Sequence, residues 1–550
     1  MYLGVDVGGT HTDAVLVSTD LQILAAAKAV TRPRVIESLQ EVLGQLLAGR
    51  DPQKVRRLTI STTLGLNSVL TGAAPPVGIM ATGGPGLELD PAEWGPLFRA
   101  LPGSQDHRGQ VIEPLPYETA LAAAQDLAQK TPILVVGAKF GPKNPALEQT
   151  MLRAAQTASP KGPVLAASSL FGRLNFARRL GGAVLNGAVQ NLYESFLDDL
   201  QNALQDRGLA PEVFVLKADG GVMSVQEARA KPVLALAAGP AASLLGLWAL
   251  VGAVDPEATE DILMIDIGGT SSDLALLSRG RPLLTPEGLT LAGRPTLVRG
   301  LLTHSLALGG DTDLVWEQGV VTPLPRRQGP ALALDPAGAA GRPPTLTDAL
   351  NVLSLCEVGD RAISRKALEK IAPGDPKQAA QAAVDAVIQK LKGALADFLA
   401  TVNGQPVYTI SEFLVDWRLN PSRAVLLGGP AATLAPLLTE ALGLPTAAPP
   451  EAATANALGA ALARPTVEAE LYADTAAGVL SAPTLNLQRQ IGHRYTLDEA
   501  KAELLAALAA QGQREAQITQ AEVFAQVSDY GESGQVIRVR AQTTPGLLTA

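Results

Sequence analysis

The chain contains one thirteen-residue pattern twice, and this repeat limits the folds that it can adopt. Residues 6–18 read DVGGTHTDAVLVS and residues 266–278 read DIGGTSSDLALLS, with seven identical positions. Apolar, β-forming residues precede each copy, at 2–5 and at 262–265. Each copy therefore predicts a strand, a tight glycine turn and a second strand. A hairpin that is duplicated in this way indicates two related halves that face a common ligand.

The residue types of the two turns suit the binding of phosphate groups. Glycine has no Cβ atom, so the backbone can approach a ligand closely, and its N–H groups can bind phosphate oxygens. Short hydroxyl side chains add further donors. A single copy could equally be a plain hairpin turn with capping aspartates, and the second copy favours the phosphate interpretation. The predicted contacts in the turns are Gly8, Gly9, Thr10, Thr12, Gly268, Gly269, Thr270 and Ser271.

An aspartate opens each copy of the repeat, at Asp6 and at Asp266. A carboxylate by itself repels phosphate. Mg²⁺ is a hard cation that takes carboxylate and water ligands, and it can lie between the carboxylates and the phosphates. The sequence therefore predicts Asp6 and Asp266 as the protein ligands of Mg²⁺.

Composition excludes several other classes of protein. The formal net charge is −9 and no basic stripe is present, so we expect no nucleic-acid groove. The single cysteine, Cys356, excludes an intramolecular disulfide and a cysteine-ligated iron–sulfur cluster. The four histidines are widely spaced in the sequence, which argues against a zinc site built on histidine.

One uncharged run, residues 232–254, is long enough to raise the question of a membrane helix. It contains Gly239-Pro240 and is dominated by alanine, so we predict a helix buried between domain layers instead. The repeat begins at residue 6, which leaves no room for a signal peptide. We therefore expect a soluble, cytoplasmic protein without a membrane span.

Alternation and helical periodicity predict a chain of strands and helices. The predicted strands are 3–7, 13–18, 58–62, 77–81, 133–138, 213–217 and 424–427. The predicted helices are 35–48, 184–207, 377–402 and 432–442. Residues 323–344, rich in Pro, Gly and Ala, are predicted to form a long surface loop over the cleft.

The last part of the chain has a different character. Thr496 and Glu499 form a capping box for a helix predicted to end near Gly512. Residues 522–527 and 535–541 are predicted to pair as a hairpin. We expect a small C-terminal α/β module.

The paired D-[VI]-G-G-T-x-[ST]-D elements resemble the two phosphate loops of the actin-like ATPase superfamily. A narrower resemblance, to the hydantoinase A/oxoprolinase family, runs from residue 1 to residue 550. Leu427–Ala431 resembles the adenosine-side loop, which makes Gly428 and Gly429 predicted nucleotide contacts. The other landmarks are Ser61-Thr62-Thr63 with Asn67, Asn144-Pro145 with Glu148, Asp219-Gly220-Gly221, Ala238–Ala241, Gly309-Gly310-Asp311 and Pro344–Ala349.

The resemblance implies an α/β fold with duplicated actin-like (ribonuclease H-like) ATPase domains around an interdomain cleft. We expect an N-terminal half at 1–180, a second half of the hydantoinase A type at 181–465, and the small module at 466–550. Longer family members continue further, so this chain is expected to be a short form.

The resemblance also implies a reaction, namely the ATP-dependent hydrolysis of a cyclic amide such as a hydantoin or 5-oxoproline. ATP and Mg²⁺ are the implied cofactors, and Asp6 and Asp266 are the implied catalytic residues. ATP would activate the lactam by phosphorylating its carbonyl oxygen. A B-type hydantoinase subunit is the implied partner, and assembly into homo-oligomers stays open.

Three further aspartates, each beside a glycine or threonine turn, are candidates for substrate or second-metal binding: Asp219, Asp311 and Asp348. The alternatives are turn capping for Asp219 and Asp311, and helix N-capping for Asp348. Ala238 stands where the family has serine, and Thr312 follows a GGD instead of the family's GGGS. The substrate specificity of classical members is therefore in doubt for this chain.

Other functions use the same fold. One is a small-molecule kinase, which would release a stable phosphorylated compound. Another is the subunit of a ketone carboxylase. A third is a non-metabolic ATPase scaffold or activator, although Cys356 alone disfavours an iron–sulfur activator. Fold does not settle function, and the cyclic-amide prediction depends on the ordered family landmarks.

Overall fold

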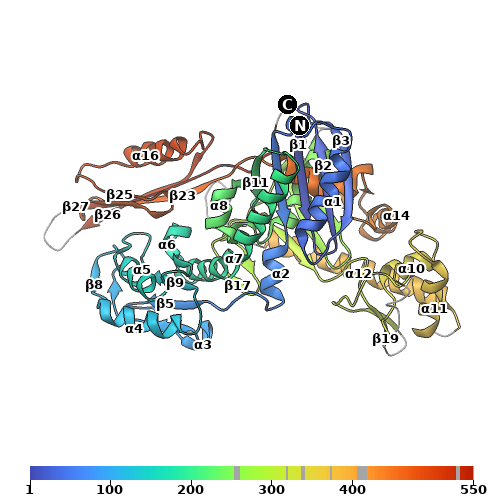
Figure 1. Cartoon of the computed structure of the whole chain (residues 1–550), viewed down its shortest axis with the longest axis horizontal. Helices are drawn as coiled ribbons and strands as arrows, with labels where there is room; N and C mark the ends of the chain where they lie inside the picture. Colours follow the sequence, from blue (N-terminus) through green and yellow to red (C-terminus); the bar gives the residue numbers. More distant parts are fainter. Residues whose placement is uncertain are drawn as a thin grey trace.

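The computed structural model of the chain describes residues 1–252, 260–285, 287–317, 320–335, 341–371, 374–404, 418–527 and 533–548. Figure 1 shows a central α/β body with the helices α10–α12 on one side of it. A smaller α/β region and the C-terminal strands lie together on the other side. The predicted α/β class is confirmed.

The first sheet carries the first predicted hairpin at its centre, in the order β12-β11-β4-β1-β2-β3. β1 and β2 are antiparallel, whereas β4 runs parallel to β1 and β11 runs parallel to β4. The strands are β1 Tyr2–Val7, β2 His11–Val17, β3 Ile23–Val30, β4 Arg57–Thr62, β11 Glu212–Leu216 and β12 Val222–Ser224. The predicted N-terminal half ended at residue 180, so this sheet draws two strands from beyond that boundary.

The second sheet repeats this plan around the second hairpin. Its order is β15-β14-β13-β21-β22, and β18 also pairs with β14. β13 and β14 are antiparallel, and β21 runs parallel to β13. The strands are β13 Asp261–Ile267, β14 Ser272–Ser278, β15 Arg281–Pro282, β18 Thr303–Leu306, β21 Arg423–Leu427 and β22 Thr446–Ala447.

The duplication extends to the hydrogen bonds of the turns. The backbone N–H of Gly8 donates to the carbonyl oxygen of His11 at 3.0 Å, and that of Gly268 donates to Ser271 at 2.9 Å. Both hairpins also align their two aspartates across the strands. The matching pairs are Asp6–Asp13 and Asp266–Asp273. The predicted duplicated halves are therefore confirmed at the level of the backbone.

The uncharged run predicted as a buried helix forms η2 (Pro232–Ala235) and α9 (Ala238–Gly252). α9 packs against α15 (Ala455–Leu462), and α15 packs on β1. The contacts are close, because a Cβ on Gly459 would lie 2.1 Å from the carbonyl oxygen of Ala242, and one on Gly4 would lie 2.0 Å from that of Ala457. No helix among the described residues has the length and apolar character needed to cross a membrane.

Longer helices cover the sheets, close to where the sequence predicts them. α7 (Phe176–Asp206) begins eight residues earlier than predicted, because the side chain of Asn175 caps it by accepting from the N–H of Arg178. The other predicted helices are α1 Val35–Leu47, α12 Pro376–Asn403 and α14 Ala431–Leu442. Shorter helices, α10 (Leu346–Val352) and α11 (Arg361–Ile371), pack with α12.

A smaller parallel sheet is inserted between β4 and α7, in the order β10-β9-β5-β6. Its strands are β5 Gly78–Thr82, β6 Phe98–Ala100, β9 Leu134–Ala138 and β10 Val164–Ala166, with helices α4 Tyr117–Ala128 and α5 Ala146–Ala158. Glu148 of the NPxxE landmark is buried here and accepts from the N–H of Ala138 at 2.9 Å. This landmark therefore stabilises the inserted region.

The C-terminal module is an antiparallel sheet in the order β25-β24-β23-β27-β26, packed against α16. The capping box at Thr496 and the helix α16 (Leu497–Ala510) are confirmed. The predicted hairpin is β26 Gln517–Val527 with β27 Ser533–Gln542, and its tip at 528–532 lies outside the described residues. The sequence missed β23 Glu468–Asp474, β24 Val479–Ala482 and β25 Leu487–Gln490.

The prediction of a surface loop at 323–344 is wrong in its middle part. Ala331, Leu332 and Ala333 are buried, because the backbone N–H groups of Leu332 and Ala333 donate to the carboxylate of Asp348. Residues 336–340 lie outside the described residues.

Candidate functional site

Asp6 and Asp266 lie one residue before the ends of β1 and β13, in matching positions of the two halves. The side chain of Asn456, near the start of α15, donates to Oδ2 of Asp6 at 3.3 Å and is also hydrogen-bonded to Asp266. One amide therefore contacts a carboxylate from each half. The structure brings together the two residues that the sequence predicted as metal ligands.

The electrostatics of this carboxylate pair are unfavourable without a cation. Burial raises the pKa of Asp6 to about 6, the Ser61 and Asn456 hydrogen bonds oppose that rise, and the charges of Asp13 and Asp266 add to it. Burial also raises the pKa of Asp266, against the hydroxyl of Ser243, which donates to its Oδ2 at 2.6 Å. Positive charge at this point would stabilise both ionised carboxylates.

An unpartnered atom marks where such a cation fits. Oδ1 of Asp6 is buried and has no hydrogen-bond partner among the described residues. The same residues contain no group of three or more His, Cys, Asp or Glu side chains placed to hold a metal. Two carboxylates with water and phosphate as further ligands suit Mg²⁺, which commonly retains several waters. The residues present therefore fit a magnesium–nucleotide complex better than a metal held by protein ligands alone.

The first glycine turn presents Gly9 and Thr10 outward, while Thr12 faces inward. Thr12 is fully buried, and its hydroxyl lies 3.1 Å from that of Thr31, which donates to the carbonyl oxygen of Gly8 at 2.9 Å. Thr12 was predicted as a nucleotide contact; its hydroxyl instead supports the turn from behind. Gly8, Gly9 and Thr10 remain in position to meet a phosphate.

The second glycine turn is supported by the GGD landmark. The N–H of Gly310 donates to the carbonyl oxygen of Gly268 at 2.9 Å, and that of Asp311 donates to Gly269 at 2.7 Å. The approach is close, because a Cβ on Gly309 would lie 2.6 Å from the oxygen of Gly268. Thr270 is exposed and Ser271 half-buried, so both hydroxyls stay available to a ligand.

The adenosine-side loop reaches the same place. Gly428 has a φ of +91°, and a Cβ there would lie 2.1 Å from the carbonyl oxygen of Ile267 and 3.0 Å from Oδ1 of Asp266. Gly429 is exposed and a Cβ there would meet no atom within 4 Å. Both predicted glycines therefore lie directly beside the second turn.

Of the three candidate substrate aspartates, only Asp311 joins this site. Its carboxylate accepts from Nε of Arg327 at 3.0 Å, and burial raises its pKa against that cation. Burial, and then the charge of Lys28, lower the pKa of His11. Among the smaller effects on this imidazole, the charge of Asp311 raises its pKa and that of Arg327 lowers it. Because His11 belongs to the first turn, these charges link the two turns.

Asp348 and Asp219 lie elsewhere and are occupied. Asp348 is fully buried and accepts from Thr345, as the N3 residue of a capping box, and from Ser364. Asp219 is buried against Arg299, whose Nη2 lies 2.6 Å away. Burial raises the pKa of Asp219, but Lys217 and Arg299 outweigh it and hold the pKa well below its usual range. The geometry favours the capping alternative for both aspartates, because Asp348 belongs to the helix cap. Asp219 accepts from the N–H of Gly221 at 2.9 Å in its own turn, in addition to its ion pair with Arg299.

Sequence reasoning named Ser61 only as part of a family landmark, and it missed two polar residues of the site, Ser243 and Asn456. Asn456 is the only strongly polar side chain in the sequence ANALGAAL of α15, and Ser243 lies in the equally apolar α9. A single polar residue on a small-residue helix is the signal that could have found them, because such a group needs a partner when buried.

Comparison with known proteins agrees with this arrangement. The family model described as Hydantoinase/oxoprolinase matches residues 179–469, and the one described as Hydantoinase/oxoprolinase N-terminal region matches residues 2–158. Together they span both halves and the glycine turns of each.

Two curated proteins are similar in sequence. One is the caprolactamase subunit alpha of Pseudomonas jessenii, 24% identical over 463 residues, which cover 78% of this chain and 64% of that protein. The other is an uncharacterized protein of Methanocaldococcus jannaschii, 22% identical over 397 residues, which cover 64% of this chain and 56% of that protein. The chain thus spans less than two thirds of either relative.

Two solved structures share the fold over 98% of this chain and 87% of their own. An acetone carboxylase in its nucleotide-free form superposes with a TM-score of 0.71 at 19% identity. The ATP-dependent caprolactamase from Pseudomonas jessenii superposes with a TM-score of 0.68 at 17% identity. At these identities the likeness establishes the fold.

Proposed function

The chain belongs to the hydantoinase/oxoprolinase family, and from that premise we propose that it binds ATP with Mg²⁺ between its two glycine turns and activates a cyclic amide. The observation that carries this proposal is the contact of one side chain, Asn456, with both Asp6 and Asp266. This shared contact supports a site in which the two carboxylates would hold one cation.

The site has the parts that phosphoryl transfer requires. Positioning and charge neutralisation provide most of the catalysis in such reactions. Asp6 and Asp266 would hold Mg²⁺, which supplies positive charge at the phosphates. The N–H groups of the turns, with Thr10, Thr270 and Ser271, would bind phosphate oxygens, and Gly428-Gly429 would lie along the nucleoside.

The acceptor is an amide, whose resonance makes direct hydrolysis slow. Transfer of the γ-phosphoryl group of ATP to the amide oxygen would release ADP and give an imidate phosphate. Water would then add to the carbon, and cleavage of the C–N bond would release the amine and leave an acyl phosphate. A second water would hydrolyse the acyl phosphate to a carboxylate and phosphate. Asp311, beside the second turn, is the aspartate that would contact the acceptor.

A partner subunit is part of this proposal. The related caprolactamase protein is named as a subunit alpha, and the present chain spans 64% of it. We propose that a B-type subunit completes ring opening after this chain has activated the amide.

The decisive experiment measures phosphate release from ATP–Mg²⁺ with hydantoins, 5-oxoproline and caprolactam, together with analysis of the organic product. Release that a lactam stimulates, that yields ring-opened product and that is lost in Asp266→Asn supports the proposal. Asp20→Asn, an exposed aspartate after β2, is the matched control and should behave as wild type. Failure of the wild-type chain to bind ATP would refute the shared-cation site.

A second candidate is ketone carboxylation, because the acetone carboxylase structure shares the fold over nearly the whole chain. ATP turnover that requires both a ketone and bicarbonate, with no response to lactams, would select it. A stable phosphorylated product would instead indicate a small-molecule kinase.

A further inference from the structure

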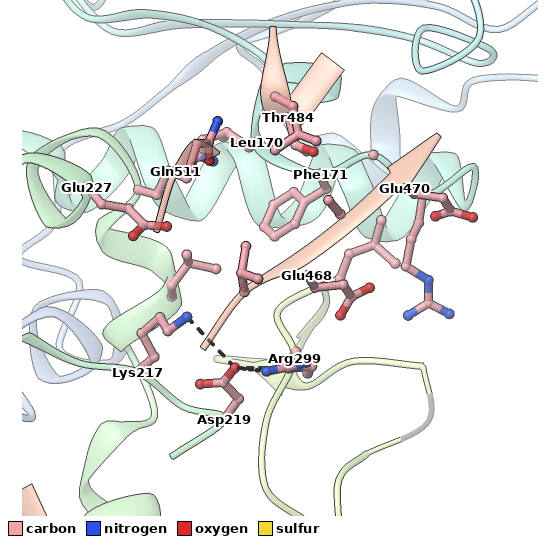
Figure 2. Close-up of a pocket in the computed structure, with 18 residues that line it drawn as sticks. Leu170, Phe171, Lys217, Asp219, Glu227, Arg299, Glu468, Glu470, Thr484 and Gln511 are labelled. Carbon is pink, nitrogen blue, oxygen red and sulfur yellow. Dashed lines mark hydrogen bonds and ion pairs between the residues drawn. The ribbon is translucent and has the colours of Figure 1, made fainter. Parts of the chain in front are cut away.

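A second cavity lies between the central body and the C-terminal module, and its volume is about 120 Å³ (Figure 2). One water needs only about 10–15 Å³ of such space, so the cavity admits a small organic molecule. Its walls come from the end of β11, from α8 (Val225–Ala230) with η2, from β23, and from Gln511 at the end of α16. A ligand here would touch both the body and the module.

Most of the charges that line this cavity are already paired. Lys217 and Arg299 both pair with Asp219, as the dashed lines in Figure 2 show. Glu468 pairs with Arg540 at 3.7 Å, and Glu470 pairs with Arg538. Because these side chains are already paired, they are not available to bind an ion from outside.

Two cations and one acid remain. Arg173, Lys231 and Glu227 line the cavity, and none of their charged groups has a hydrogen bond or ion pair with any residue that the structure describes. Burial lowers the pKa of Lys231, Glu227 raises it and Lys217 lowers it further. Lys231 and Arg173 are half-buried without such a partner, and burial of a charge without a partner is costly, so an anion in the cavity would stabilise both.

The remaining wall is apolar. It is made by side chains from the end of α6 (Ala167–Leu170) and the residue after it, from η2, from the segment before Arg299 and from the short η4 turn (Pro483–Leu485). These side chains are Leu170, Phe171, Leu234, Leu297 and Leu485. Inorganic ions gain nothing from such a wall, whereas an aliphatic chain does.

We propose that this cavity binds a small organic carboxylate with a short aliphatic body, whose charge is neutralised by Lys231 and Arg173 and whose chain lies against the leucine side chains. The proposal is independent of the nucleotide site, since it uses none of the residues placed there. Binding would link the module to the body, because the cavity is lined by residues of both.

The test is calorimetric titration of the full-length chain with pentanoate, glutarate and inorganic phosphate as separate probes. Saturable binding of pentanoate or glutarate, weakened about tenfold or more by Lys231→Met or by Arg173→Met, is the expected result, since a charge-assisted hydrogen bond is worth about tenfold in affinity or more. Lys161→Met, at an exposed lysine outside the cavity, is the matched control and should bind as wild type does.

Three results would overturn the proposal: no saturable carboxylate binding, binding of phosphate alone, or carboxylate binding that neither variant weakens. Thermal unfolding of each variant shows whether it is folded, and the two variants change different walls of the cavity. A folded variant of either kind therefore decides the question.

Discussion

Asp6 should destabilise the protein in the absence of nucleotide and stabilise it in its presence. Burial raises the pKa of Asp6 from the ordinary 3.8 to about 6. Each tenfold change in proton affinity is worth about 1.4 kcal/mol, so ionisation of Asp6 costs the folded protein about 3 kcal/mol once the pH exceeds both values. Asp6→Asn removes that charge and keeps an oxygen acceptor for Asn456.

The sign follows from linkage. Because the pKa of this acid is higher in the folded state, its stabilising effect is fully present below about pH 4 and is lost as the pH rises through about 6. Between pH 5 and pH 8 the loss amounts to about 1.4 kcal/mol. The free energy of unfolding of Asp6→Asn should therefore exceed that of wild type by about 1.6 kcal/mol at pH 5 and by about 3 kcal/mol at pH 8.

Nucleotide should reverse this order. A ligand present at a thousand times its Kd stabilises the folded state by about 4.1 kcal/mol, which exceeds the advantage of about 3 kcal/mol that Asp6→Asn has at pH 8. ATP–Mg²⁺ should give wild type this gain and give Asp6→Asn little or none. The assay is thermal denaturation at pH 5 and pH 8, with and without ATP–Mg²⁺, with Asp20→Asn as the control. Equal stability of the variant and wild type at pH 8 without nucleotide would refute the reasoning from burial.

Three other substitutions test separate parts of the structure. Gly428→Ala places a Cβ 2.1 Å from the carbonyl oxygen of Ile267 at a φ of +91°. It should therefore lower the free energy of unfolding by about 1–2 kcal/mol and weaken nucleotide binding in a titration. Gly429→Ala is the control, because a Cβ there meets open space, and it should keep wild-type stability. Asp348→Ala leaves the buried N–H groups of Leu332 and Ala333 without their acceptor and should cost about 3 kcal/mol in thermal unfolding, and a loss below about 1 kcal/mol would contradict the buried-cap assignment. Asn456→Ala removes hydrogen bonds that lower the pKa of both site carboxylates, so the acid limb of the phosphate-release profile should move to higher pH, and an unmoved limb would contradict that role.

The strands and turns of the two halves could be predicted because their signal is local. Each hairpin joins neighbouring segments, and its apolar strands and glycines specify the turn without reference to the rest of the chain. The pairing of β11 and β12 with the first sheet could not be predicted in this way, because it joins residues 212–224 to a strand at 57–62. Nothing in local periodicity records which strands become neighbours.

The candidate site was predictable at its turns and not at its supports. The burial of Thr12 could have been predicted, because strand alternation puts its side chain on the same face of the sheet as those of Val7 and Ala14, which are buried. The side chain of His11 lies on the other face. Similar turns precede Asp219, Asp311 and Asp348 in the sequence. Their roles differ only in side-chain burial and in their hydrogen-bond and ion-pair partners, which the sequence does not give. Arg299 lies 80 positions from Asp219, so their ion pair could not be inferred from spacing.

The helix α15 explains how two distant halves can form one metal site. It follows the second sheet in sequence, but its backbone contacts β1 at Gly4 and α9 at Ala242. Both contacts are so close that a methyl group would not fit there. Asn456 at its start therefore has a fixed position relative to Asp6, and Ser243 on α9 has a fixed position relative to Asn456. Since Ser243 contacts Asp266 and Asn456 contacts both carboxylates, two packed helices set the positions of one carboxylate from each half.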